Sequence, residues 1–419
     1  MQMWAYVVRR VALLVPIIIG VMTITFVLVN ALGPIQQIQS AFGNPPPHSR
    51  IQTYDPTIPC SLINPGQNGT CANPLYEQRA AELGLDKPIF VQYGLYIYRA
   101  LTFQWGFVAN QSSAARLTPL GALIKGQPVA TALSWLLPYT IELALLSLAM
   151  ILAIAIPLGN LSAVYRNRPI DQVARVFSFS GFALPAFLLG TLLVFGLVLA
   201  MGTGAFVHTP WCPSGESALS EITGSWPSVS QYGECSFPGG LVSNYGYPSW
   251  LVSGVISHPT GFPTVDALIH GDGWLALDTL LRILLPALVI TFGTVAILLR
   301  FVRNSMLEVM NLDYIRTARS KGVPESTVIH RHAGRNSMNV TITVLGLTFA
   351  AFLSGFPIIE DVFSLNGVGL IITYAVLPLG GYDFGLIFGS VLLFTFLVVG
   401  ANLIVDILYA YLDPRVRLG

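Results

Sequence analysis

The chain has 419 residues, of which 53% are hydrophobic and only 10% are charged, against roughly 25% charged residues in an ordinary soluble domain. The 21 basic and 20 acidic residues leave a net charge of +1, which excludes nucleic-acid binding driven by bulk charge. This composition also excludes intrinsic disorder, so the chain either buries a very large core or lies in a lipid bilayer.

Continuous apolar runs decide between these alternatives, because a membrane-spanning helix needs about 20 such residues. Runs of about this length are Val11–Leu32, Leu136–Val164, Val176–Met201, Ile283–Leu299, Val340–Ile359 and Phe384–Leu412. We therefore expect an all-α integral membrane protein with six transmembrane helices. The fourth run is short and should continue as helix beyond Arg300. The first run is longer than the roughly 7–15 apolar residues of a signal peptide, so we expect it to be retained.

The distribution of basic residues predicts which side of the membrane each segment occupies, because Lys and Arg are retained on the cytoplasmic side. Basic residues gather before the first run, between the second and third, between the fourth and fifth, and after the last. Both termini should therefore be cytoplasmic. The expected regions are 1–32 (N-terminus and first span), 33–135 (external), 136–201 (second and third spans), 202–282 (external) and 283–419 (the remaining spans with a cytoplasmic link at 300–339).

All four cysteines lie in the two long external segments. Four cysteines allow three pairings, and short loops within one segment favour Cys60–Cys71 and Cys212–Cys235. Disulfides fit an oxidising compartment outside the cytoplasm. A zinc site that uses His208 and Cys212 is a weaker alternative.

One stretch of the first external segment has helical periodicity. Apolar residues recur at helical spacing within Pro88–Phe107, from Phe90 and Tyr93 to Ile97 and Leu101. We expect a helix that lies at the membrane interface or packs within an external cap.

The sequence lacks the phosphate-binding loop of ATPases and the common hydrolase and metalloprotease motifs. We therefore expect no enzymatic activity, no metal and no cofactor in this chain. Charged residues inside a membrane are functional candidates. Here they are Glu142 in the second run and Asp406 in the last, and each could instead be a structural hydrogen-bond partner. Their scarcity disfavours an ion-driven transporter.

The cytoplasmic link at 300–339 is polar, basic and helical in period. Ala318 and Gly322 are four residues apart, so we expect them to share one helix face on which another protein could approach the backbone. Arg316 and Lys321 would frame that contact. An ordinary solvated basic loop is the alternative.

These residues resemble the permeases of ATP-binding-cassette importers, and specifically the dipeptide/oligopeptide/nickel class. The resemblance extends over most of the membrane region and rests on Arg9-Arg10, Leu83–Pro88, Leu137–Leu145, Ile156–Gly159, Asp313–Gly322, Arg331–Ala333, Arg335-Asn336, Glu360, Val362–Ser364, Gly367–Gly369, Asn402–Asp406 and Asp413–Arg417. Arg316, Thr317 and Ala318 replace the Glu-Ala-Ala of the general importer signature. The insertions around 35–80 and 206–276 are longer than usual in this family.

The resemblance implies one half of a translocation pore for short peptides. The expected partners are a second homologous permease, two cytoplasmic ATPases that bind ATP and Mg, an external solute-binding protein and the lipid bilayer. Oligosaccharides, nickel complexes and glutathione are alternative cargoes. An ATP-independent channel or secondary transporter and a membrane-anchored receptor are alternatives of another class.

Two groups of residues should carry the mechanism. The ATPase contact is expected at Tyr314, Arg316, Thr317, Ala318, Lys321 and Gly322. An external gate or pathway is expected at Glu142, Glu360, Phe363, Gly367 and Gly369. The two glycines predict a tight non-helical turn, and an ordinary external turn is the alternative.

Overall fold

A computed structural model describes residues 3–31, 81–109, 124, 126–201, 260–269, 271, 273–338, 341, 356–363, 365, 367–376 and 383–412. In these ranges the chain is helical, apart from short turns and one isolated β-bridge between Phe107 and Pro128. The helices are α1 (Met3–Ala31), α5 (Ile89–Leu101), α8 (Val129–Val164), α9 (Pro169–Ala183), α10 (Ala186–Met201), α13 (Pro263–Ile269), α14 (Gly273–Met310), α15 (Asp313–Ser320), α16 (Glu325–Thr327), the π-helix η4 (Val328–Gly334), α18 (Phe356–Val362), α19 (Val368–Ala375) and α20 (Phe384–Leu412).

Four of the described helices are long and apolar enough to cross a membrane. They contain the stretches Val8–Ala31, Val129–Val164, Thr279–Met310 and Phe384–Ile407. A fifth candidate is a bent pair of helices, so the described chain has four or five candidate spans. The all-helical membrane class is thereby confirmed. Most of the predicted span Val340–Ile359 lies outside the described residues.

The third predicted span, Val176–Met201, is not one straight helix. α9 and α10 meet at an angle of 94°. Leu184 between them has extended backbone, with φ −102° and ψ 117°, and Pro185 follows it. Proline lacks an N–H and disfavours helical backbone in the residue before it, which explains the break that the apolar run concealed.

α14 is the helix against which the centre of the bundle is built. It packs along both α8 and α9. A Cβ atom at Gly159 of α8 would lie 2.7 Å from Val302, and one at Gly181 of α9 would lie 2.5 Å from the Cβ of Ala296. The absence of side chains at these glycines lets the three helix backbones approach closely.

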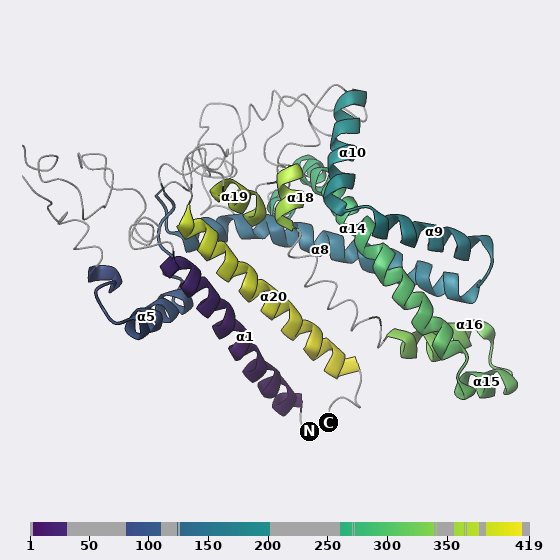
Figure 1. The fold of residues 1–419 in the computed structure, drawn as a ribbon. Coiled ribbons are helices and arrows are strands. Elements are labelled where there is room, and N and C mark those ends of the chain that lie inside the picture. The colour runs from purple at the N-terminus through teal and green to yellow at the C-terminus, as the bar shows by residue number, and fades with distance from the viewer. Residues whose placement is uncertain are drawn as a thin grey trace, which may run out of the picture.

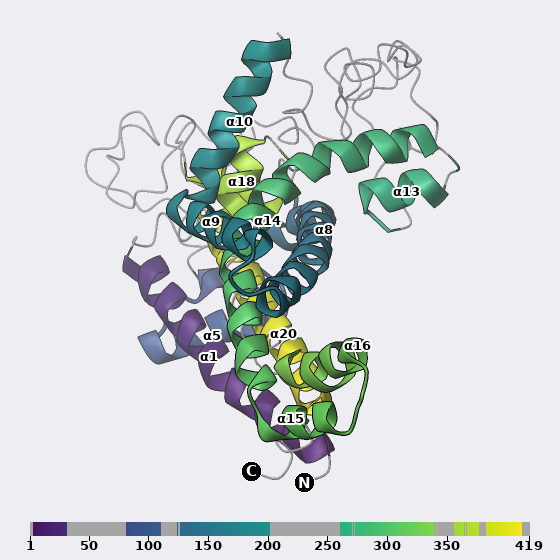
Figure 2. The same ribbon diagram turned by 90° about the vertical axis from the view of Figure 1, so that its right-hand side faces the viewer.

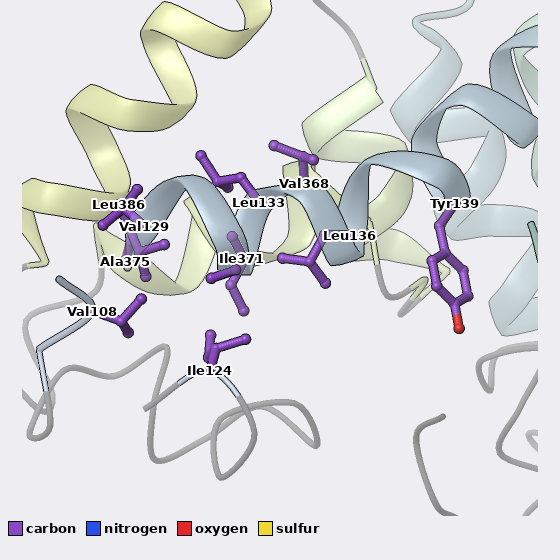
Figure 3. Close-up of a cluster of buried hydrophobic side chains, with 11 residues drawn as sticks. Val108, Ile124, Val129, Leu133, Leu136, Tyr139, Val368, Ile371, Ala375 and Leu386 are labelled. Atoms are coloured by element: carbon purple, nitrogen blue, oxygen red, sulfur yellow. The ribbon is translucent and has the colours of Figure 1, made fainter. Parts of the chain in front are cut away.

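A buried hydrophobic cluster holds α19 and α20 against the first turns of α8 (Figure 3). Its members come from these three helices and the neighbouring segment: Val108, Ile124, Val129, Ala132, Leu133, Leu136, Tyr139, Val368, Ile371, Ala375 and Leu386. This cluster positions α19, which is too short to be stable alone.

α1 lies beside α20 and α5 (Figure 1). The Thr23 and Tyr93 hydroxyls are 2.7 Å apart, and the Phe26 ring packs against Tyr93. The predicted helix within Pro88–Phe107 is therefore present as α5, and it packs on α1. The Arg10 guanidinium pairs with the Asp406 carboxylate at 3.1 Å, which joins the first helix to the last.

α15 and α16 lie at the same end of the molecule as the start of α1 and the end of α20, whereas α18 and α10 lie toward the other end (Figures 1 and 2). α15 and α16 of the link therefore share one side of the bundle with the start of α1 and the end of α20.

Candidate functional site

The short helix α15 is anchored to the end of α14 by a small hydrophobic cluster. Ile315 is fully buried in it, among Met306, Val309, Val328 and Ala333. Ala318 packs against the same cluster from the outside. We expected Ala318 to lie on a helix face that another protein could approach. Instead, Ala318 is turned partly toward the chain's own core.

The exposed surface of α15 carries polar and basic side chains. Tyr314, Arg316, Thr317 and Lys321 are exposed there. Arg316 lies within 3.4 Å of Asp313, but both side chains are largely in solvent, where such a pair contributes little. These side chains are accessible to a protein partner.

Gly322 does not continue the helix face of Ala318. α15 ends at Ser320, and Gly322 has φ +74°, in the left-handed region. Its N–H donates to the Arg319 carbonyl at 3.0 Å, and the Val323 N–H donates to the Ala318 carbonyl at 3.2 Å. This is a Schellman cap, the helix ending for which glycine is favoured. The prediction that Gly322 shares a face with Ala318 is therefore wrong.

The cap is followed by contacts that fold the segment back on itself. The Asn336 side-chain amide donates to the Tyr314 hydroxyl at 2.7 Å. The Arg319 guanidinium donates to Glu325 at 2.6 and 3.1 Å, and this interaction lowers the pKa of the Glu325 carboxyl. α15, α16 and η4 therefore form a compact unit at the end of α14.

Asp171 forms a polar centre that the sequence analysis missed. Its carboxylate is completely buried and accepts hydrogen bonds from the Ser162 hydroxyl at 2.7 Å, the Asn167 N–H at 2.9 Å and the Arg303 Nε at 2.7 Å. Arg175 pairs with the same carboxylate. These donors belong to α8, the following turn, α14 and α9. A single acid four residues before an arginine, in a link that is otherwise basic, is the signal that could have found it.

At the opposite end, Glu360 of α18 caps the N-terminus of α19. Its carboxylate accepts from the Gly369 N–H at 2.6 Å, the Leu370 N–H at 3.3 Å and the Thr140 hydroxyl at 2.7 Å. The Thr140 hydroxyl oxygen also accepts from the Val368 N–H at 3.0 Å. Complete burial outweighs these hydrogen bonds and raises the pKa of Glu360 to about 7.

The glycines at 367 and 369 are explained by this close approach. A Cβ at Gly367 would lie 2.2 Å from a Glu360 oxygen, and one at Gly369 would lie 2.3 Å from the Pro357 Cα. Gly367 is extended, as the predicted turn requires, whereas Gly369 is already inside α19. The structure thus brings Glu360, Gly367 and Gly369 together.

Phe363 and Glu142 have different surroundings. Phe363 is completely buried within the chain, near Gly190 of α10, so it lines no open path in this conformation. Glu142 lies beside Thr264 and Asp266 of α13, and its Oε2 is buried without a hydrogen-bond partner in the described part of the chain. Cys60, Cys71, Cys212 and Cys235, and with them His208, lie outside the described residues.

Comparison with known proteins shows the family to which the chain belongs. The profile of the family described as binding-protein-dependent transport system inner membrane component matches residues 155–418. The chain belongs to this family. It is therefore a multi-pass permease of the inner membrane, and it is not itself a catalytic subunit.

The similarity to individual relatives covers the whole chain, beyond the residues that the family model matches. The chain is 30% identical, over 100% of its length and 99% of the relative, to the probable D,D-dipeptide transport system permease protein DdpB of Escherichia coli K12. It is 29% identical, over 99% of both chains, to the dipeptide transport system permease protein DppB of the same strain. The match to this permease includes α1 and the predicted external segments as well as the bundle.

Proposed function

We propose that this permease forms one half of the pore of an ATP-driven importer for short peptides. The observation that carries the proposal is similarity over the full length to permeases named for dipeptide transport. The other half would be a second homologous permease. Two ATPases would bind ATP and Mg on the cytoplasmic side, and an external solute-binding protein would deliver the peptide.

In this proposal α15 is the contact with an ATPase. The exposed side chains of Tyr314, Arg316, Thr317 and Lys321 form the contact surface. The Schellman cap at Gly322 and the packing of Ala318 fix the direction of α15 relative to α14. Because Ile315 is clamped by the end of α14, a displacement of α15 is expected to carry α14 with it.

The Asp171 centre extends this connection. It joins α14 to α8 and α9 through Arg303, Ser162 and Arg175. We expect the three helices to move as one body when the ATPases close. Glu360, Gly367, Gly369 and Phe363 would support the external gate, with Glu142 near its entrance.

The proposed topology has six spans with both termini in the cytoplasm. It is supported by the positions of the start of α1, the end of α20 and α15, which lie on one side of the bundle (Figure 1). A single reporter cysteine at the exposed Asn167, in a chain whose own cysteines are replaced, should be shielded from an impermeant label in intact cells. A reporter at Ser228 should react, and labelling of Asn167 from outside would refute this topology. The pairs Cys60–Cys71 and Cys212–Cys235 remain proposed disulfides, which peptide mapping without reduction tests.

The transport function itself is tested by reconstitution. The permease is purified with its partner subunits in proteoliposomes, and uptake of labelled tri-alanine is measured with the solute-binding protein and ATP. An ATPase variant that binds but does not hydrolyse ATP is the control and should abolish uptake. Uptake of glutathione, an oligosaccharide or a nickel complex in place of peptides would assign another cargo. Uptake that does not need ATP would contradict the importer.

A further inference from the structure

A cavity of about 640 Å³ lies between the last turns of α8 and the π-helix η4. Its volume is within the range of small-molecule binding sites. Leu161 and Val164 of α8 form part of one wall, and Ile329 and Met338 form part of the other. π-Helices are rare, and they often mark functional sites. The candidate sites described above include no residue of this cavity.

The polar groups of the cavity are of two kinds. Asn160 lines it, and the side-chain oxygen of this residue is buried without a hydrogen-bond partner in the described part of the chain. That oxygen requires an N–H or O–H donor. The exposed side chains of Arg335 and His330 also line the cavity, and the ion pairs and hydrogen bonds of the described residues leave the Arg335 guanidinium unpaired. The site therefore offers a cation and a buried acceptor to the same ligand.

His330 is oriented by its own helix. Its Nδ1 lies 2.9 Å from the Ser326 carbonyl oxygen, and because a carbonyl only accepts, Nδ1 carries a proton. The other ring nitrogen is then left for a ligand. The lining of the cavity includes no carboxylate among the described residues, so an anionic group is favoured there.

We propose that this cavity binds a short peptide on the cytoplasmic side of the permease, with the peptide's terminal carboxylate on Arg335 and a peptide N–H on the Asn160 oxygen. This inference rests on the proposed peptide transport. Apolar walls suit peptide side chains without selecting among them. An anionic lipid would satisfy Arg335, but its acyl chain has no donor for the buried oxygen. The site would hold a peptide after it has passed the pore and before it is released.

The test is calorimetric titration of the purified complex in phosphatidylcholine nanodiscs, without binding protein or ATP. Tri-alanine should bind, and tri-alanine amide, which lacks the carboxylate, should bind about tenfold more weakly or worse, as loss of a charge-assisted hydrogen bond predicts. Arg335→Gln should weaken tri-alanine to the same extent and should leave the amide unchanged. Asn160→Leu should weaken both peptides. Arg331→Gln is the matched control, because Arg331 is an exposed arginine of the same π-helix that does not line the cavity, and it should bind as wild type.

The comparison of the two peptides needs no variant, so it remains decisive even if Arg335→Gln fails to assemble. Equal binding of the peptide and its amide would overturn the proposal. The proposal would also be overturned if phosphatidylglycerol binds through Arg335 in discs where tri-alanine does not bind. If the complex imports tri-alanine in the uptake assay but either of these results is obtained, only the cavity assignment fails. If no peptide is imported, the proposed transport function fails first.

Discussion

The Arg303 Nε lies 2.7 Å from Oδ1 of Asp171, although 132 residues separate the two in sequence. Their contact joins the first turn of α9 to α14, the helix that leads into α15. Because the Asp171 side chain is fully buried and Arg303 is mostly so, the surroundings screen this pair much less than they screen the pairs on α15.

Asp171→Asn should therefore be strongly destabilising. It leaves two arginines beside a neutral side chain, and breaking a buried pair in this way typically costs about 3–5 kcal/mol. The measurement is the thermal unfolding of the purified permease complex, together with ATP hydrolysed per peptide imported. Asp313→Asn is the control: Asp313 is 95% exposed beside Arg316, and exposed pairs contribute roughly 0–1 kcal/mol. Equal melting of the two variants would remove Asp171 from the proposed connection between the helices.

Gly322→Leu should impair the α15 contact through the backbone rather than through crowding. A Cβ at Gly322 meets no described atom within 4 Å, but φ +74° costs a side chain roughly 1–2 kcal/mol. Gly322→Asn should be tolerated better, because Asn adopts this region more readily. Co-purification of the ATPases and peptide uptake are measured for both variants.

Gly271→Leu is the matched control for this experiment. Gly271 has φ +78° and equally open surroundings, but it lies in the turn before α14. The Gly271→Leu substitution imposes the same backbone strain far from α15, so the ATPases should remain bound. If Gly322→Leu assembles and transports as wild type does, α15 is not the coupling contact.

Gly369→Ala should disrupt the junction of α18 and α19. Its Cβ would lie 2.3 Å from the Pro357 Cα and 2.8 Å from Glu360 Oε2, and overpacking of this kind typically costs about 1–3 kcal/mol. We expect a lower melting temperature and a leak of solute in the absence of ATP. Gly400→Ala in α20 has open space around its Cβ and should melt at the wild-type temperature or slightly above it. If the Gly369→Ala permease leaks no solute and melts at the wild-type temperature, the proposed role of this junction is contradicted.

Glu360 predicts a pH dependence of stability. Its pKa is raised from 4.5 to about 7 by burial, so the folded state holds the proton more tightly than the unfolded state does. The stabilisation is complete below the unfolded pKa of 4.5 and is lost as pH rises through about 7. Thermal unfolding between pH 5 and about 8 should show this loss in wild type. Glu360→Gln, which cannot ionise, should show a smaller dependence, and parallel profiles would assign the loss to other groups.

The sequence predicts helix location better than tertiary contacts. The last run, Phe384–Leu412, coincides with α20, and the second run ends with α8 at Val164. Long apolar stretches determine such boundaries because the bilayer requires continuous helix. Pro185 is visible in the sequence, but membrane helices often tolerate proline, as α8 does at Pro138 and Pro157. Periodicity alone therefore did not predict the break.

The candidate site was predicted only in part for a related reason. The four-residue spacing of Ala318 and Gly322 assumes that the helix continues, whereas the chain caps itself between them. The environment of Asp171 depends on Arg303, which no local pattern connects to it. Glu360 was singled out by the family resemblance, and Gly367 and Gly369 by their position near Phe363; the structure brings Glu360 and the two glycines together, and their part in a gate stays a prediction.

The contact between α1 and α20 has a consequence for biogenesis. α1 leaves the ribosome long before α20 does, yet Arg10 pairs with Asp406 and Met22 packs with Leu392. Neither contact can form until α20 has been synthesised. We therefore expect α1 to enter the bilayer with its apolar surface in contact with lipid and to dock onto α20 late, after the helices between them have been inserted.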